Sequence, residues 1–236
     1  MSPCISRGVL WLKIYFNLGR YLCMGPRVVI RNTSMTYYVS KSAMMRMESL
    51  IKELAASIEA PRDITDKALD IAIRCIERGL TRGRSYRCVA LAALYAASRI
   101  LGRPFPLKRI STIAGVPLKD LRSCYNSILE TFERELREIR PPDPRSYIGY
   151  IAKRLGLGNE VVSEALRILD EIRAKIPIEG KDPTGYATAA IYIASERFGH
   201  RLSKNKLSIE TGLTEVTIRA RIKEVAERLG IKVENI

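Results

Sequence analysis

The chain has 236 residues, 47% of them hydrophobic, which is enough for one large domain or two ordinary ones with a buried core. With 40 Lys and Arg against 25 Asp and Glu, its formal net charge of +15 favours a polyanionic partner, usually nucleic acid, over a generically basic protein without one. One histidine, five scattered cysteines without a C-x-x-C pair, and no glycine-rich phosphate motif argue against most enzyme classes and zinc sites, so we predict no catalysis, metal or cofactor.

Residues 1–43 form a basic N-terminal segment with six basic and no acidic residues. Its apolar stretch GVLWLKIYFNLGRYLCMG is interrupted by Lys13, Asn17 and Arg20, which makes it a poor transmembrane helix. Three interpretations stay open: a basic arm, a helix on a membrane surface, or an incorrectly assigned start codon. The only strand signal in the chain is weak, the RVVI at 27–30.

The remainder of the chain contains two copies of one sequence repeat. At an offset of 97 residues, GRSYRCVALAALYAASRILG (83–102) aligns without a gap on GKDPTGYATAAIYIASERFG (180–199). Twelve of the 48 positions from 83 to 130 are identical to their counterparts. Because this period is too long for a solenoid, we predict two tandem domains, at 44–139 and 146–236, joined by the proline-rich linker RPPDPR at 140–145.

Each unit reads as about five helices, so the fold class is all-α. Asp182 followed by Pro183, and Thr214 before an apolar periodic run, are typical helix starts. The helices predicted for the second unit are Ser146–Leu155, Glu160–Ala174, Pro183–Phe198, Lys204–Thr211 and Glu215–Leu229.

The third helix of each unit is alanine-rich, as expected of a helix that neighbours approach closely on several sides. Cys75, Cys88 and Cys124 sit in apolar helical patterns and are expected to be buried thiols, while His200 follows Gly199 in a loop and is expected at the surface. An odd number of scattered cysteines suits a reducing, intracellular compartment.

The last two helices of the second unit have helix-turn-helix spacing with a glycine in the turn. The final helix buries Ile218 and Ile222 on one face and directs Val216, Arg219, Ala220 and Lys223 outward. Arg219 suits a guanine edge and Val216 a thymine methyl, whereas the alternative is a corner that only packs. Phosphate contacts are predicted for flanking cations: Arg201, Lys204, Lys206, Arg221 and Lys223.

The first unit has an equivalent corner with a different outward stripe. Lys119, Arg122, Ser123 and Asn126 face outward there, and Pro117 is in the turn. Residues 74–122 carry eleven basic and two acidic residues, so this unit is a candidate for binding phosphates. The cations proposed for DNA phosphates or a protein partner are Arg84, Arg103, Lys108, Arg109, Lys119 and Arg122.

The motifs YAASR, GKDPTGYATAAIYIAS and GLTEVTIRARIKE together resemble the core of archaeal transcription factor B, related to the eukaryotic general transcription factor IIB, over about 44–230. The resemblance implies two cyclin-like repeats that clamp TATA-binding protein on bent promoter DNA. It also implies that the second repeat reads the purine-rich element upstream of the TATA box. By position, the base-reading residues are Val216, Arg219 and Thr217, and a segment with Lys181 and Thr184 lies near DNA and TATA-binding protein.

The sequence departs from that family at its start. The family begins with a zinc ribbon that docks on RNA polymerase, and no paired C-x-x-C occurs here, so we expect weak polymerase recruitment or a modulating role. Two alternatives stay open: a cyclin-like adaptor that binds only proteins, and a helix-turn-helix regulator that works without TATA-binding protein. In either case we expect a monomer in the cytoplasm, and a DNA-binding chain at the nucleoid.

Overall fold

A computed structural model describes the backbone of residues 21–24, 27–32, 35–132, 143–175, 177–178 and 180–233, with side chains from residue 40 onward. The predictions for residues 1–20, and for residues 140–142 of the linker at 140–145, lie outside these described residues. The three interpretations of the apolar N-terminal stretch therefore stay open.

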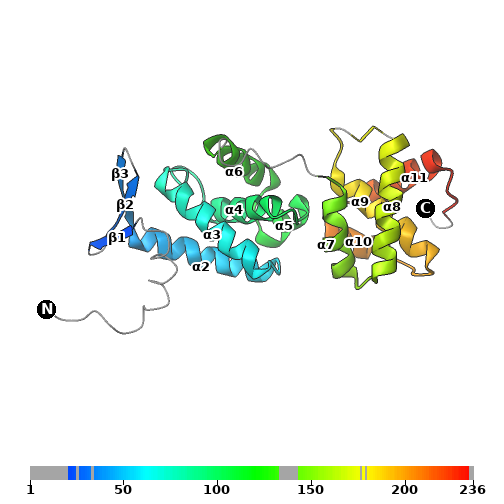
Figure 1. The fold of residues 1–236 in the computed structure, drawn as a ribbon, viewed down its shortest axis with the longest axis horizontal. Coiled ribbons are helices and arrows are strands. Elements are labelled where there is room, and N and C mark those ends of the chain that lie inside the picture. Colours follow the sequence, from blue (N-terminus) through cyan, green and yellow to red (C-terminus); the bar gives the residue numbers. More distant parts are fainter. Residues whose placement is uncertain are drawn as a thin grey trace.

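The first described elements form a small antiparallel sheet that the sequence did not predict in full. Strands β1 (Tyr21–Met24), β2 (Arg27–Asn32) and β3 (Met35–Ser40) pair in the order β1-β2-β3. Only the core of β2 had been suggested, because strands this short leave little periodicity to detect. The sheet lies at the end of the first unit that is remote from the second unit (Figure 1), so the all-α description holds for the two repeats themselves.

Repeat one, as we name the first helical unit, consists of five helices among the described residues. Ile51 and Leu54, from the first helix, and Ile64 and Ile71, from the second, are buried in its core. The helices are α2 (Lys41–Ser57), α3 (Arg62–Glu77), α4 (Tyr86–Ile100), α5 (Leu107–Ala114) and α6 (Leu118–Thr131).

Repeat two, the second helical unit, has its helices within a residue or so of the predicted bounds. Asp182 accepts a hydrogen bond from the backbone N–H of Thr184 at 3.0 Å, and Thr214 accepts one from Thr217 at 3.2 Å, which confirms both predicted caps. The helices are α7 (Arg145–Leu155), α8 (Asn159–Lys175), α9 (Pro183–Arg197), α10 (Lys204–Thr211) and α11 (Glu215–Leu229).

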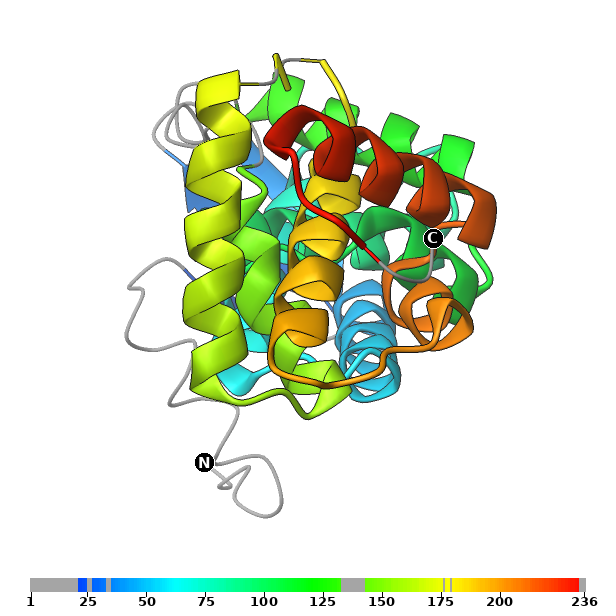
Figure 2. The same cartoon turned by 90° about the vertical axis from the view of Figure 1, so that its right-hand side faces the viewer.

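The alanine-rich helices α4 and α9 are central, as predicted. Every residue of α4 from Cys88 to Ser98 is buried, and so is every residue of α9 from Thr184 to Ser195. Figure 2 shows α9 running between α8 and α11. Small side chains permit this close approach, because a larger residue on any face would push a neighbouring helix away. Cys75, Cys88 and Cys124 are buried free thiols of repeat one, and His200 is exposed, all as expected.

Across the part of the chain that the structure describes, no helix combines the length and apolarity needed to cross a membrane.

Candidate nucleic-acid interface

The corner between α10 and α11 has the geometry of a helix-turn-helix. Helix α10 ends at Gly212, whose φ of 70° is the left-handed conformation that glycine adopts most readily. The chain then crosses to Thr214, which caps α11. Leu213 and Ile218 are both buried on the inner side of this start. The turn and the cap together hold the first half of α11 at the surface of repeat two.

The outer face of α11 is open, as the helical periodicity predicts. Val216 is 75% exposed, and the side chains of Arg219 and Lys223 are 54% and 66% exposed. On the opposite face, Ile218 and Ile222 are fully buried. An apolar side chain as exposed as Val216, next to two cations, suits a base edge in a DNA groove better than the protein core.

Two contacts along α11 fix how these side chains are presented. Arg219 donates to Glu215 at 3.2 Å across one helical turn, which orients the guanidinium along the outer face. The hydroxyl groups of Thr214 and Thr217 lie 2.8 Å apart, so the Thr217 side chain is tied to the helix cap. Val216 and Arg219 are therefore both exposed on the first half of α11, with Arg219 held along the helix by Glu215.

A charged cluster ties α11 to the loop before α9. Glu224 accepts from Lys181 at 2.9 Å and from the Tyr186 hydroxyl at 3.2 Å, and Arg221 donates to that hydroxyl at 3.0 Å while lying over the tyrosine ring. Burial raises the pKa of Glu224, but Lys181 and Arg221 outweigh it, and the net pKa is below its usual value. Two cations predicted to contact DNA thus share one carboxylate, which positions the loop carrying Lys181 against α11.

The corresponding corner of repeat one, α5 to α6, also presents its predicted stripe to solvent. Lys119, Arg122, Ser123 and Asn126 are exposed and line a shallow hollow of about 600 Å³ along α6. Arg84 donates to Ser127 at 2.9 Å at the edge of the same surface. This stripe is more polar than that of α11 and has no exposed valine.

Between the repeats lies a groove of about 410 Å³ that gathers several predicted residues from both units. Lys108 and Arg122 reach it from repeat one, and Lys181 and Thr184 from repeat two. Lys108 lies 3.3 Å from Asp182, the cap of α9, so the two walls are joined by an ion pair. Tyr95 and Tyr147 also line the groove, and burial together with the neighbouring Tyr95 raises the pKa of Tyr147.

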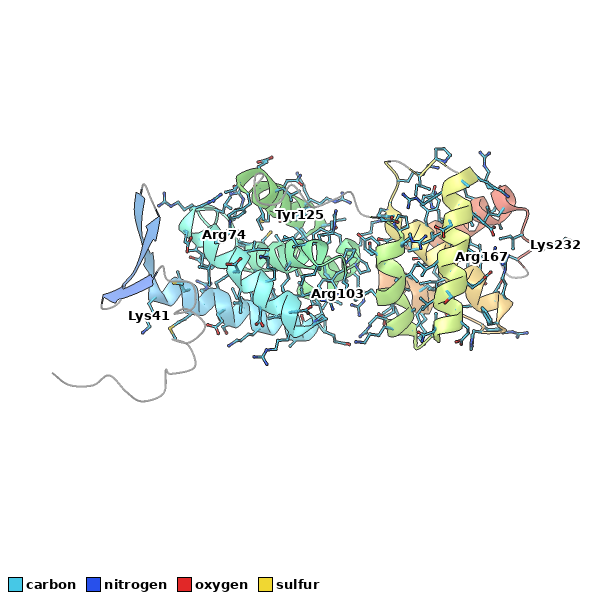
Figure 3. All side chains as sticks on the ribbon, in the orientation of Figure 1. Lys41, Arg74, Arg103, Tyr125, Arg167 and Lys232 are labelled. Carbon is cyan, nitrogen blue, oxygen red and sulfur yellow. The ribbon has the colours of Figure 1, made fainter. Side chains whose placement is uncertain are left out.

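The remaining predicted cations lie at separate places on the two repeats, and they differ in their partners. Arg103, labelled in Figure 3, pairs with Asp63 on the surface of repeat one, and the Lys204 ammonium lies 5.2 Å from the ring centre of Tyr192. Arg201 and Lys206 are exposed around α10. Arg109 differs from all of these because it is only 6% exposed and pairs with Glu210 of repeat two. Its guanidinium therefore serves the junction between the repeats and is not available to a phosphate.

The sequence analysis missed the residues that join the two repeats. Glu210, Arg154, Tyr150 and Glu59 make contacts with Arg109 or with one another across the junction. No sequence signal marks them, because an ion pair between residues far apart in the chain has no local period. Among the described residues, no group of three or more His, Cys, Asp or Glu side chains is placed to hold a metal ion.

The fold and this surface define a class: a tandem helical-repeat protein whose second repeat ends in a basic helix-turn-helix. The family model described as "Transcription factor TFIIB repeat" matches twice, at residues 40–131 and 137–228. Both ends of the second match are displaced by 97 residues from the first, the same offset that aligns the sequence with itself. The chain belongs to the TFIIB family, which consists of transcription initiation factors and not of enzymes.

Relatives of the chain are named as transcription initiation factors of this family. The chain is 39% identical to "Transcription initiation factor IIB" of Pyrobaculum islandicum over 184 residues, and 37% identical to that of Archaeoglobus fulgidus over 186 residues. These alignments cover 78% of this chain but only 54% and 56% of the relatives, so the chain spans about half the length of the relatives it matches. A viral cyclin from herpesvirus saimiri aligns over 80% of this chain and 87% of its own, with 13% identity and a TM-score of 0.35, too low for an argument.

Proposed function

We propose that this chain binds the complex of TATA-binding protein and promoter DNA, and that it acts in the assembly of the preinitiation complex or in its modulation. In this proposal α11 enters the major groove upstream of the TATA box. The observation that carries it is the exposed pair Val216 and Arg219 at the start of a helix whose other face is fully packed.

The proposed DNA contacts are of two chemical kinds, contacts to bases and contacts to phosphates. Arg219 donates to the O6 and N7 acceptors of a guanine, and Val216 packs on a thymine methyl. Exposed lysines and arginines around this corner and on repeat one contact phosphates, which position the protein without selecting sequence. This second set consists of the exposed residues Arg201, Lys206, Lys223, Arg84, Arg103, Lys119 and Arg122, and of the half-buried Lys204.

The groove between the repeats is proposed to receive TATA-binding protein and the adjoining DNA backbone. Its cationic walls, with Lys108 and Lys181 on opposite sides, suit an acidic or phosphate-bearing surface. Thr184 lies in the first turn of α9 on the same wall, beside the N-terminal end of a helix that favours negative charge.

A gel shift on a TATA promoter, with and without TATA-binding protein and at several salt concentrations, tests the proposal. We expect a supershift of the preformed complex, whose affinity falls by about 10³-fold or more between about 50 and 200 mM salt if six or more phosphates are contacted. A chain that leaves the preformed complex unshifted at low salt does not have this function. A shift without TATA-binding protein would favour an independent helix-turn-helix regulator.

One substitution distinguishes the proposed function from the alternative of an adaptor that binds only proteins. Arg219→Ala weakens promoter binding if α11 reads DNA, but leaves binding to a protein unaffected if the chain only joins proteins. Arg228→Ala is the matched control, since it removes the same type of side chain from an exposed position in the last turn of α11, at the other end from the proposed base contacts. Equal promoter affinity of Arg219→Ala and the wild type would remove α11 from the DNA-reading role.

A further inference from the structure

The junction between the two repeats is held by a carboxylate that is buried between cations from both sides. Glu210 on α10 is 9% exposed and lies 3.1 Å from the guanidinium of Arg109, which belongs to α5 of repeat one. Its same oxygen lies 2.8 Å from Nε of Arg154 on α7. Figure 1 shows α5 at the end of repeat one that faces α7 and α10. One carboxylate thus joins three helices from two repeats.

The network continues back into repeat one through Arg154. This guanidinium also contacts Glu59, which follows the end of α2, and the contact lowers the pKa of Glu59. Arg109 donates to the hydroxyl of Tyr150, and the Tyr150 ring meets Phe105 edge to face with ring centres 5.7 Å apart. This network therefore crosses the junction by two ion pairs, once in each direction, in addition to the Lys108–Asp182 pair, and an aromatic contact lies beside it.

Glu59 occupies a backbone conformation that is unusual for a residue other than glycine. Its φ of 55° makes it the only described residue other than glycine with a positive φ. At the offset of 97 residues its counterpart in repeat two is Gly156, with a φ of 68°, which ends α7 in the ordinary way. Repeat one thus has a strained glutamate where repeat two has a glycine, and the carboxylate of that glutamate contacts the other repeat.

The other members of the network are also specific to one copy. At the same offset, Glu210 corresponds to Ile113, Arg154 to Ser57 and Arg109 to Lys206. Ile113 and Lys206 are exposed. The network is therefore not a consequence of how each repeat packs internally, since neither repeat contains the equivalent ion pairs.

The backbones also meet closely at this point. A Cβ added to Gly212, in the turn after α10, would lie 2.5 Å from the backbone nitrogen of Arg109. Such a contact leaves no room for a side chain, so α10 and α5 meet in a defined register. Ion pairs, an aromatic contact and close backbone packing all converge on one orientation of the repeats.

We propose that Glu210, Arg109, Arg154 and Glu59 form an inter-repeat latch, a set of positioning residues that fixes the orientation of the two repeats before any partner binds. Resting on the function proposed above, the latch places the α11 stripe and the cationic wall of repeat one at the spacing needed to contact one DNA–protein complex together. A partner then binds a chain that is already in the competent orientation. Its apparent affinity is therefore not reduced by a fraction of chains in other orientations.

The orientation itself is measured with residual dipolar couplings of backbone amides in the full chain, without DNA or TATA-binding protein. The wild type is expected to fit one alignment tensor for both repeats. Glu210→Gln, which removes the central charge, is expected to need two tensors of different magnitude. Glu171→Gln is the matched control, because Glu171 pairs with Arg167 on the surface of α8, away from the junction, and it should keep one tensor.

Glu59→Gly separates a positioning role from a structural one. It installs the residue found at the equivalent place in repeat two and relieves the strained backbone, so the unfolding midpoint should stay unchanged or rise. It also removes one crossing ion pair, so the tensors of the two repeats should diverge. A variant that folds at least as well as the wild type but loses the common tensor is explained by positioning alone.

Promoter binding gives the functional readout. Glu210→Gln is expected to raise the apparent Kd for the complex of TATA-binding protein and promoter about 10-fold, as when the competent orientation falls to about a tenth of the population. Glu171→Gln should change it less than about 2-fold. A wild type that needs two tensors, or Glu210→Gln and Glu59→Gly variants that keep one, overturns the latch. If the wild type does not bind the promoter complex, the proposed function fails, while the couplings still decide whether the latch exists.

Discussion

The α5–α6 corner of repeat one and the α10–α11 corner of repeat two share a backbone plan but not a surface. Both begin with an eight-residue helix and turn at a glycine with positive φ, 63° at Gly115 and 70° at Gly212. Their outward stripes differ, because Lys119 stands where repeat two has Val216. Their surroundings differ as well, since Gly212 lies against α5 while Gly115 is open. The two corners thus keep the same scaffold, whereas their outward side chains and their neighbours differ.

The largest effect is expected from alanine at the two turn glycines. Each substitution costs about 1–2 kcal/mol, because a side chain is strained at positive φ. At Gly212 the added Cβ also meets the Arg109 backbone at 2.5 Å, and this overpacking costs about 1–3 kcal/mol more. Urea unfolding of Gly212→Ala and Gly115→Ala measures the difference. Equal losses would mean that the backbones do not meet at the junction.

Next in size is the loss of a base contact. Arg219→Ala is expected to cost about 1–3 kcal/mol at one base pair of the upstream element. The control is its counterpart Arg122→Ala, which removes an exposed arginine from the same register of repeat one. That change should weaken all sequences alike and reduce the salt slope by about 1. Competition gel shifts with single base-pair changes distinguish the two variants. If both variants lose the same affinity on every sequence, the two corners do not differ in reading bases.

A smaller effect is expected from the start of the second helix in each corner. Thr214 caps α11 by accepting from the backbone of Thr217, whereas Pro117 at the equivalent place in repeat one makes no such bond. Thr214→Ala should therefore lower the free energy of unfolding by about 0.5–2 kcal/mol. Pro117→Ala is expected to cost only about 0.4–1 kcal/mol, through greater freedom of the unfolded chain. Urea midpoints measure both, and a larger loss at Pro117 would contradict the assigned cap.

The smallest effect concerns acid stability. Hydrogen bonds from Arg167 at 2.8 and 2.9 Å, with Arg197 nearby, lower the pKa of Glu164 in repeat two to about 2. At the equivalent place repeat one has Lys67, 3.6 Å from Asp70 in an exposed pair. A lowered folded pKa means that the stabilisation is present above the unfolded pKa of about 4.3 and is lost as the pH falls toward 2.

Glu164→Gln should accordingly cost about 1 kcal/mol at pH 7, allowing for solvent screening, and the cost should shrink between pH 5 and 2. Urea midpoints across that range measure it. The control is Glu227→Gln, which replaces a carboxylate that is 65% exposed and 3.8 Å from Lys223. A cost for Glu164→Gln that is the same at every pH would show that charge is not its origin.

Much of the fold was predictable because its signals are local. The five helices of repeat two, the caps at Asp182 and Thr214, and the exposure of Val216 follow from spacing within a few residues. The sheet at residues 21–40 was largely missed, because its short strands carry little periodicity. The family resemblance suggested which outward residues face DNA, a role that the helical periodicity by itself could not assign.

The sequence by itself determined the repeat, its helices and which face of α11 points outward, since each depends on interactions within one helix or one turn. Only the tertiary structure decided that Arg109 is buried at the junction, that Lys181 and Arg221 share Glu224, and that the carboxylate of Glu59 reaches the other repeat. Apart from the Arg221–Glu224 contact within α11, each of these pairs joins segments that are far apart in the chain. A charge has the same appearance in a sequence whether its partner is a phosphate, a solvent ion or a distant carboxylate. The packing of these segments, within repeat two and between the two repeats, selects the partner.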